Sequence, residues 1–326
     1  MAISQIGTAS ISGLGYGFKN RILNGAMQVA QRATSATITA GSTIAAGYST
    51  VDRFYVYCTG ANVTAAQVAG SGAVKNNLQI TGAASVTAVG VGQRIESLNS
   101  YDLAGSTATL SVNLANSVLT TVTWTAYYAN TADTFGTLAS PTRTQIATGT
   151  FTVTSTLTNY QTNISIPAAA TTGIEIVFTV GAQTSGTWTI GNVQLEAGTV
   201  ATNFDYRPYG TELALCQRYC YFAGNLTSGL TMLGGLGTAG TTTEADIQFN
   251  FPVTMRASPS VTAYSGTSFQ AYDFNVGAIS VSSPTISAAS SVSCFVYFTG
   301  TGLTQYRPYS LRTNNTAGGL LFSAEL

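Results

Sequence analysis

The sequence predicts an all-β protein, and three observations point to that fold class. Short runs of residues alternate between apolar and polar types with the two-residue period of a β-strand. Glycine, serine and asparagine separate these runs, so many short strands follow one another. Charged residues make up 7% of the 326 residues, against roughly a quarter in a typical soluble domain, so uncharged polar side chains must solvate the surface. We expect a jelly-roll β-sandwich followed by a smaller C-terminal β domain with one short helix.

The alternation gives the expected organisation of the chain. Residues 1–18 are rich in glycine and serine, have no apolar core, and are predicted to be an N-terminal attachment segment. Residues 19–210 alternate throughout and are predicted to form the jelly roll, a carbohydrate-binding-module-like domain. Residues 211–326 are predicted to form a C-terminal β head domain for receptor binding and trimerisation.

Two places in the jelly roll fix the expected strand faces. In residues 121–128, Val122, Trp124, Ala126 and Tyr128 share one face, and we expect Trp124 to lie in the core, as we do for Trp188. In residues 187–195 the apolar residues occupy even positions up to Ile190 and odd positions from Val193. The switch falls at Gly191-Asn192 and predicts a β-bulge.

The change of pattern at residue 211 predicts the helix and the domain boundary. Thr211 is the expected N-cap, Glu212 lies in the first turn, and Leu213, Cys216 and Cys220 follow at helical spacing. Strands return afterwards. The apolar residues of 292–298 occupy both faces of one strand, with Phe295 and Tyr297 opposite the others, which predicts burial on both sides and hints at a subunit interface.

Composition excludes several function classes. The chain has no histidine, so a Ser-His-Asp triad is impossible. Twelve basic and twelve acidic residues balance without any basic cluster, so no nucleic-acid partner is expected. Without a run of about 18 apolar residues, no membrane insertion is expected. The four cysteines, with no histidine to help, predict buried thiols and neither a metal site nor a cofactor: Cys58, Cys216, Cys220 and Cys294.

One pair of carboxylates keeps a catalytic alternative open. Glu244 and Asp246 lie two residues apart on one face of a predicted strand, at roughly 6.5 Å, within the range of a glycoside-hydrolase pair. The interpretation we favour is a solvated strand face, so no enzyme and no catalytic residues are expected.

Aromatic residues beside amides and hydroxyls are the type of surface that binds sugars. Tyr127 and Tyr128 end a strand before Asn130 and Asp133. Residues 264–274 place four aromatic side chains among polar ones, although a hairpin with a core-facing aromatic row fits this segment equally well. The candidate glycan-binding residues are therefore Tyr127, Tyr128, Tyr264, Phe269, Gln270, Tyr272, Asp273 and Phe274.

Several phrases, in order along the chain, resemble the adhesion domains of tailed-bacteriophage tail fibres. They open with residues 20–27 (NRILNGAM), Gln31-Arg32 and residues 48–54 (YSTVDRF), and the corresponding domain end is found in residues 193–198 (VQLEAG) and 201–208 (ATNFDYRP). Three later phrases complete the resemblance: residues 212–219 (ELALCQRY), 251–259 (FPVTMRASP) and 321–326 (LFSAEL).

This resemblance implies a virion protein of the phage tail that mediates host adhesion by non-catalytic recognition of a cell-surface glycan. It implies a homotrimer whose residues 1–18 dock to tail or adaptor proteins, and burial of apolar sheet edges independently favours trimerisation. The chain has no shaft repeats, so the fibre would be short. The alternatives are a purely structural virion adaptor or decoration protein, and a polysaccharide depolymerase.

Overall fold

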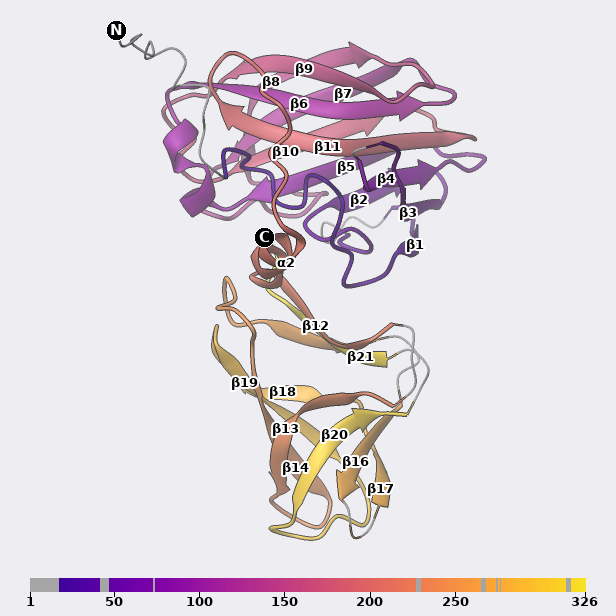
Figure 1. The fold of residues 1–326 in the computed structure, drawn as a ribbon, viewed down its shortest axis with the longest axis vertical. Coiled ribbons are helices and arrows are strands. Elements are labelled where there is room, and N and C mark those ends of the chain that lie inside the picture. The colour runs from indigo at the N-terminus through magenta and orange to yellow at the C-terminus, as the bar shows by residue number, and fades with distance from the viewer. Residues whose placement is uncertain are drawn as a thin grey trace, which may run out of the picture. The chain divides into compact units, whose positions relative to one another are not determined.

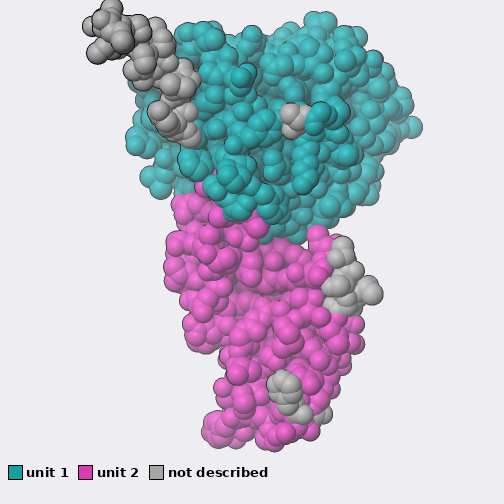
Figure 2. All heavy atoms as spheres, viewed as in Figure 1, with its two compact units in different colours: residues 1–212, 326 teal, residues 213–325 magenta. Residues whose placement is uncertain are grey.

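The computed structural model describes residues 18–41, 47–72, 74–226, 230–264, 268–273, 275, 277–314 and 318–326. The chain forms two compact units, residues 1–212 with Leu326 and residues 213–325 (Figure 2). The expected boundary after residue 210 lies two residues before this division. The expected attachment segment, 1–18, lies outside the described residues apart from Phe18. Within the described ranges the elements are strands, one α-helix and two short 3-10 helices, which confirms the all-β prediction.

The first unit is a sandwich of two antiparallel sheets (Figure 1). The six-stranded sheet has the order β1 (Ser35–Ile38), β3 (Val63–Ala69), β4 (Asn76–Thr81), β11 (Thr187–Ala197), β6 (Thr107–Asn116), β9 (Thr158–Ser165). The five-stranded sheet has the order β2 (Tyr55–Thr59), β5 (Ala88–Ile95), β10 (Ile174–Val180), β7 (Thr121–Ala129), β8 (Arg143–Thr152). The 3-10 helices η1 (Ser97–Asn99) and η2 (Tyr101–Leu103) follow β5. This arrangement confirms the predicted jelly-roll sandwich.

The core lies between the two sheets and is built from the apolar face of each strand. Trp188 is fully buried and Trp124 is 6% exposed, as predicted. The predicted bulge in β11 is confirmed, because its pairing with β6 shifts register between Gly191 and Gln194 and Asn192 has a left-handed φ of 43°. Because of the bulge, Val193 points into the core although it is an odd number of residues after Ile190.

Buried polar contacts tie the beginning of the domain to its end. The Asn20 side chain donates to the Val193 carbonyl at 3.0 Å and accepts from the backbone N–H of Leu195 at 3.0 Å. Nearby, Glu212 accepts from the Asn24 N–H at 2.6 Å and pairs with Arg207 at 3.1 Å. The phrases that open and close the domain in the sequence are therefore in direct contact.

The predicted helix is present as α2 (Tyr209–Gln217), with different ends. It begins three residues earlier than expected, at Tyr209 instead of Glu212, because the N–H groups of Thr211 and Glu212 both donate to the Pro208 carbonyl. A proline suits this place, since its φ is preset for a helix. Thr211 is therefore not the N-cap, and Cys220 is the first residue of β12, not a residue on the helix face. The four cysteines are free thiols and buried.

The second unit contains two antiparallel sheets. The three-stranded sheet has the order β12 (Cys220–Asn225), β21 (Gly318–Ser323), β15 (Ser260–Ala263). The larger sheet has the order β17 (Gly277–Val281), β16 (Phe269–Asp273), β20 (Pro308–Thr313), β13 (Met232–Ala239), β14 (Glu244–Asn250), β19 (Ser293–Thr299), β18 (Thr285–Ala289). Within the described chain, none of the helices has the length and hydrophobicity needed to cross a bilayer.

The strand predicted to be buried on both sides is β19, and only one of its faces is buried within the chain. Cys294, Val296 and Phe298 point into the core of the unit. Phe295 lies on the opposite face and is 46% exposed. The prediction of two-sided burial is therefore wrong for a single chain, because no described element of this unit packs over this part of the sheet.

Candidate functional site

The side of the five-stranded sheet that faces away from the core carries a cluster of aromatic and charged side chains. We call this surface the tyrosine face and define it by Tyr55 and Tyr57 of β2, Arg94 of β5, Glu175 of β10, Tyr127 of β7 and Arg143 of β8. The strand period of two turns these residues away from the core. Register brings them together, since Glu175 lies opposite both Arg94 and Tyr127 in the neighbouring strands.

Two glycines in β5 make room for the rings of two tyrosines in β2. Tyr57 pairs with Gly90 and Tyr55 pairs with Gly92. A methyl group added to either glycine would overlap the ring of its tyrosine, so each ring lies over the backbone of the next strand. Tyr57 is half-buried. Its ring also packs against the small apolar cluster around Tyr55 and Val177, and the rest of the side chain is exposed.

A buried carboxylate holds the charged side chains in place. Glu175 is fully buried, and its Oε1 accepts from Arg94 Nε at 2.9 Å and from the Tyr55 hydroxyl at 2.8 Å. Its Oε2 accepts from Arg143 Nη1. Arg94 Nη2 donates to the Gly136 carbonyl at 3.0 Å. Such charge-assisted bonds are stronger than neutral ones, so they fix the positions of both arginines.

The Tyr55 and Tyr57 phenols remain protonated at neutral pH. Burial, together with the Glu175 carboxylate, raises the pKa of Tyr55 well above its ordinary value of 10.0. Burial also raises the pKa of Tyr57. Both hydroxyls are therefore neutral groups that can donate hydrogen bonds.

Threonines continue the surface beside the rings. Thr179 of β10 lies opposite Gly90 of β5, and Thr123 of β7 lies opposite Thr179. The hydroxyl groups of these two threonines therefore continue the row that begins at the Tyr57 ring. In the next row, Thr125 and Thr148 hydrogen-bond to each other at 3.1 Å. The face thus combines an aromatic ring, hydroxyl groups and a guanidinium, which are the groups that bind saccharides.

Of the two residues predicted in this unit, the structure brings only one to the face. Tyr127 lies there, with the Arg143 guanidinium 4.1 Å from the centre of its ring. Tyr128 points to the other side of the strand and packs against the core. Sequence reasoning missed Tyr55, Tyr57 and the arginines; the available signal was the matching alternation of tyrosines in 55–57 and glycines in 90–92.

The candidates in the second unit are divided between two sides of β16. Phe269 lies in the core and is 2% exposed, whereas Gln270 and Tyr272 point outward. Arg312 links these two, because its guanidinium lies 4.1 Å from the Tyr272 ring centre and its Nε donates to Gln270 Oε1 at 3.0 Å.

The remaining candidates of this segment lie apart from that pair. Asp273 forms an ion pair with Arg307 at 3.1 Å, and the Tyr264 ring packs against Phe222 at 5.6 Å. Phe274 lies outside the described residues. The segment therefore offers one outward aromatic ring that is described, and a guanidinium covers part of it.

The carboxylate pair of the catalytic alternative lies on the exposed side of β14. Glu244 and Asp246 are both exposed. Asp246 Oδ1 accepts from the Ser287 hydroxyl at 3.0 Å. The pair therefore lies on the solvated side of the strand.

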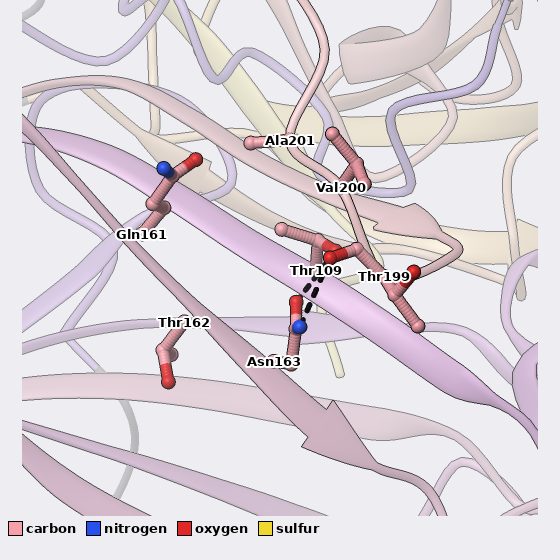
Figure 3. A pocket seen from close by; sticks show the side chains of 7 residues that line it. All are labelled: Thr109, Gln161, Thr162, Asn163, Thr199, Val200 and Ala201. Atoms are coloured by element: carbon pink, nitrogen blue, oxygen red, sulfur yellow. Dashed lines mark hydrogen bonds between the residues drawn. The ribbon is translucent and has the colours of Figure 1, made fainter.

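A hollow of about 280 Å³ opens at the edge of the six-stranded sheet, between β6, β9 and residues 199–201 (Figure 3). Asn163 bridges its floor: it accepts from Thr109 at 2.9 Å and donates to the Thr199 carbonyl at 2.9 Å. The hollow has no aromatic side chain in its lining, and these polar groups already bond to one another. It is therefore a weaker sugar site than the tyrosine face. Among the residues that the structure describes, no three of His, Cys, Asp or Glu gather as a metal site would require.

Comparison with known proteins gives similarity at the level of structure alone. Neither a protein-family model nor a curated protein matches the sequence. Solved structures similar to this chain include the enzymatically active domain of tailspike protein 4 of bacteriophage CBA120, with 18% identity, a TM-score of 0.35, and coverage of 55% of this chain and 22% of that one. The match therefore spans about a fifth of the tailspike chain.

Two other similar structures are shorter than this chain. One is a putative sugar binding protein from Bacteroides thetaiotaomicron, with 13% identity, a TM-score of 0.36, and coverage of 55% of this chain and all of that one. The other is TmCBM61 in complex with beta-1,4-galactotriose, with 11% identity, a TM-score of 0.34, and coverage of 56% and 100%.

Proposed function

We propose that this protein binds a glycan, without cleaving it, through the tyrosine face. The observation that carries the proposal is the Tyr57 ring, which lies over Gly90 and is partly exposed. Aromatic rings with one open side stack against the apolar side of sugar rings, while neighbouring polar groups bind their hydroxyls. Tyr127 and the threonines of β7, β8 and β10 provide those polar groups.

The biological setting that we propose is a phage tail fibre that adheres to a host-cell surface. Its support is the ordered set of phrases from residue 20 to residue 326. A depolymerase is the catalytic alternative, and a structural adaptor is the alternative without a receptor. Incubation with host polysaccharide tests for the depolymerase. If the polysaccharide is shortened, and Asp246→Ala abolishes the shortening, binding without cleavage is contradicted.

Replacing Tyr57 by alanine is expected to weaken glycan binding about tenfold or more. Removal of the ring eliminates a stacking surface, and about 1.4 kcal/mol corresponds to a factor of ten. A glycan array of bacterial surface polysaccharides, probed with the full chain, identifies a ligand, and calorimetry with that ligand then compares the variants.

Tyr101→Ala is the matched control, because Tyr101 is 60% exposed and lies on η2, outside the tyrosine face. It is expected to bind as the unmodified chain does. The proposal would be abandoned if no glycan on the array bound, or if Tyr57→Ala retained full affinity.

The assembly that we propose is a homotrimer. Its support is a set of exposed apolar side chains on the outer face of the seven-stranded sheet: Met232 is 55% exposed, Leu236 is 72% exposed and Phe295 is 46% exposed. Burying such groups against a second copy stabilises an assembly. Light scattering is expected to give a mass near three times the 33.6 kDa of one chain, and Leu236→Glu is expected to lower it. A stable monomer at micromolar concentration rules the trimer out.

A further inference from the structure

The guanidinium of Arg143 has most of its hydrogen-bonding capacity unused. Arginine carries five N–H donors, and the Arg143 contact with Glu175 occupies Nη1. No other acceptor for Arg143 occurs among the residues that the structure describes. Its side chain is 14% exposed, so the remaining donors are within reach of a ligand at the surface.

Two guanidiniums, those of Arg94 and Arg143, bind the Glu175 carboxylate. Arg94 is 4% exposed, and it also donates to the Leu326 oxygen at 2.8 Å and to the Gly136 carbonyl at 3.0 Å, so its donors are engaged within the fold. Burial lowers the pKa of Arg143, but the Glu175 carboxylate raises it, and the net shift is upward, so Arg143 stays cationic. Of the two cations bound to Glu175, Arg143 is therefore the one whose charge is accessible at the surface.

Neutral donors surround that charge. Tyr127 lies directly beneath the guanidinium, and the Tyr57 phenol is close enough for the charge of Arg143 to act on its pKa. In the described structure neither phenol of this pair has a hydrogen-bond partner. A ligand with one carboxylate and several hydroxyls can bond to the planar guanidinium of Arg143 and to the two phenols beside it.

We propose that the tyrosine face selects acidic sugars of the uronic-acid type, with the sugar carboxylate bound by Arg143 and the sugar ring stacked on Tyr57. This inference rests on the proposed function, because it names the ligand class of the same site. A carboxylate accepts two parallel hydrogen bonds from a guanidinium, which a hydroxyl or an ester does not reproduce. Glu175 keeps its bonds to Arg94 and Tyr55 when the ligand binds.

Matched pairs of ligands test the charge requirement. Calorimetry with the full chain compares tetragalacturonate and tetraglucuronate with their methyl esters, which retain the sugar ring but lack the negative charge. We expect at least one acid to bind about tenfold more tightly than its ester at low salt, and the ratio to fall as salt rises. Arg143→Gln is expected to bring the ratio near one. Arg143→Lys, which keeps the charge but loses the planar fork, is expected to give an intermediate ratio.

Arg21→Gln is the matched control, because Arg21 is a partly exposed arginine of the same unit that pairs with Asp102 outside the tyrosine face. It is expected to leave the ratio unchanged, and circular dichroism checks that each variant is folded. Equal binding of acid and ester, or an unchanged ratio in Arg143→Gln, overturns the inference and leaves the proposed function in place. If neither form of any sugar binds and the array is also negative, both fail.

Discussion

Glu175→Ala is expected to destabilise the first unit by about 3–5 kcal/mol. Glu175 is fully buried and accepts hydrogen bonds from Arg94, Arg143 and Tyr55. Its removal leaves a buried guanidinium without its counter-charge, and breaking a buried ion pair from one side has a cost of this size. Denaturant unfolding of the full chain, followed by tryptophan fluorescence, measures the loss, because Trp124 and Trp188 both lie in this unit.

The control is an ion pair with the same chemistry at the surface. Arg21 and Asp102 have side chains that are 27% and 42% exposed. Asp102→Ala is expected to change the unfolding free energy by less than about 1 kcal/mol, since solvent screens exposed pairs. If Glu175→Ala unfolded at the same denaturant concentration as Asp102→Ala, the buried network would contribute no more to stability than an exposed ion pair.

Gly90→Ala is expected to reduce glycan binding by an order of magnitude or more while the fold is kept. The added methyl group occupies the space of the Tyr57 ring, which must move off the backbone of β5. Tyr57 is half-buried, so its ring can turn toward solvent without disrupting the core. The stacking surface is then lost even though every polar group of the face remains. Calorimetry with the ligand identified on the array measures the change.

Gly181→Ala provides the comparison. It follows the end of β10, a methyl group there meets no atom within 4 Å, and its φ is not in the left-handed region. We expect unchanged affinity and unchanged unfolding. If both alanine variants bound equally well, the position of the Tyr57 ring would be irrelevant to recognition and the tyrosine face would lose its main support.

Local patterns explain which parts of the fold could be predicted from the sequence. The two-residue period acts within one strand, so it predicts the buried side of 121–128 and the parity switch at Gly191-Asn192 without any knowledge of pairing. The sequence misplaces the start of α2, because Thr211 fits the N-cap preference, whereas the Pro208 carbonyl accepts the first bonds.

The site depended on contacts that the sequence does not display. Tyr57 and Gly90 are 33 residues apart, and only the pairing of β2 with β5 shows that one supports the other. Glu175 lies within an apolar run of the sequence, and its three partners, Arg94, Arg143 and Tyr55, come from three other strands. Local composition also proposed Tyr128 and Phe269 as glycan-binding residues, but both side chains point toward the cores of their units.

The contact between the opening and closing phrases of the first unit has an evolutionary consequence. Asn20 bonds to β11 near its end, and Glu212 reaches back to Asn24, so the entry and exit of this module lie side by side. Modules with adjacent ends tolerate insertion into foreign chains. Genetic recombination at these two phrases would exchange the whole sandwich, its tyrosines included, while the flanking segments stayed in frame. A single crossover event would in that way give the chain a different tyrosine face.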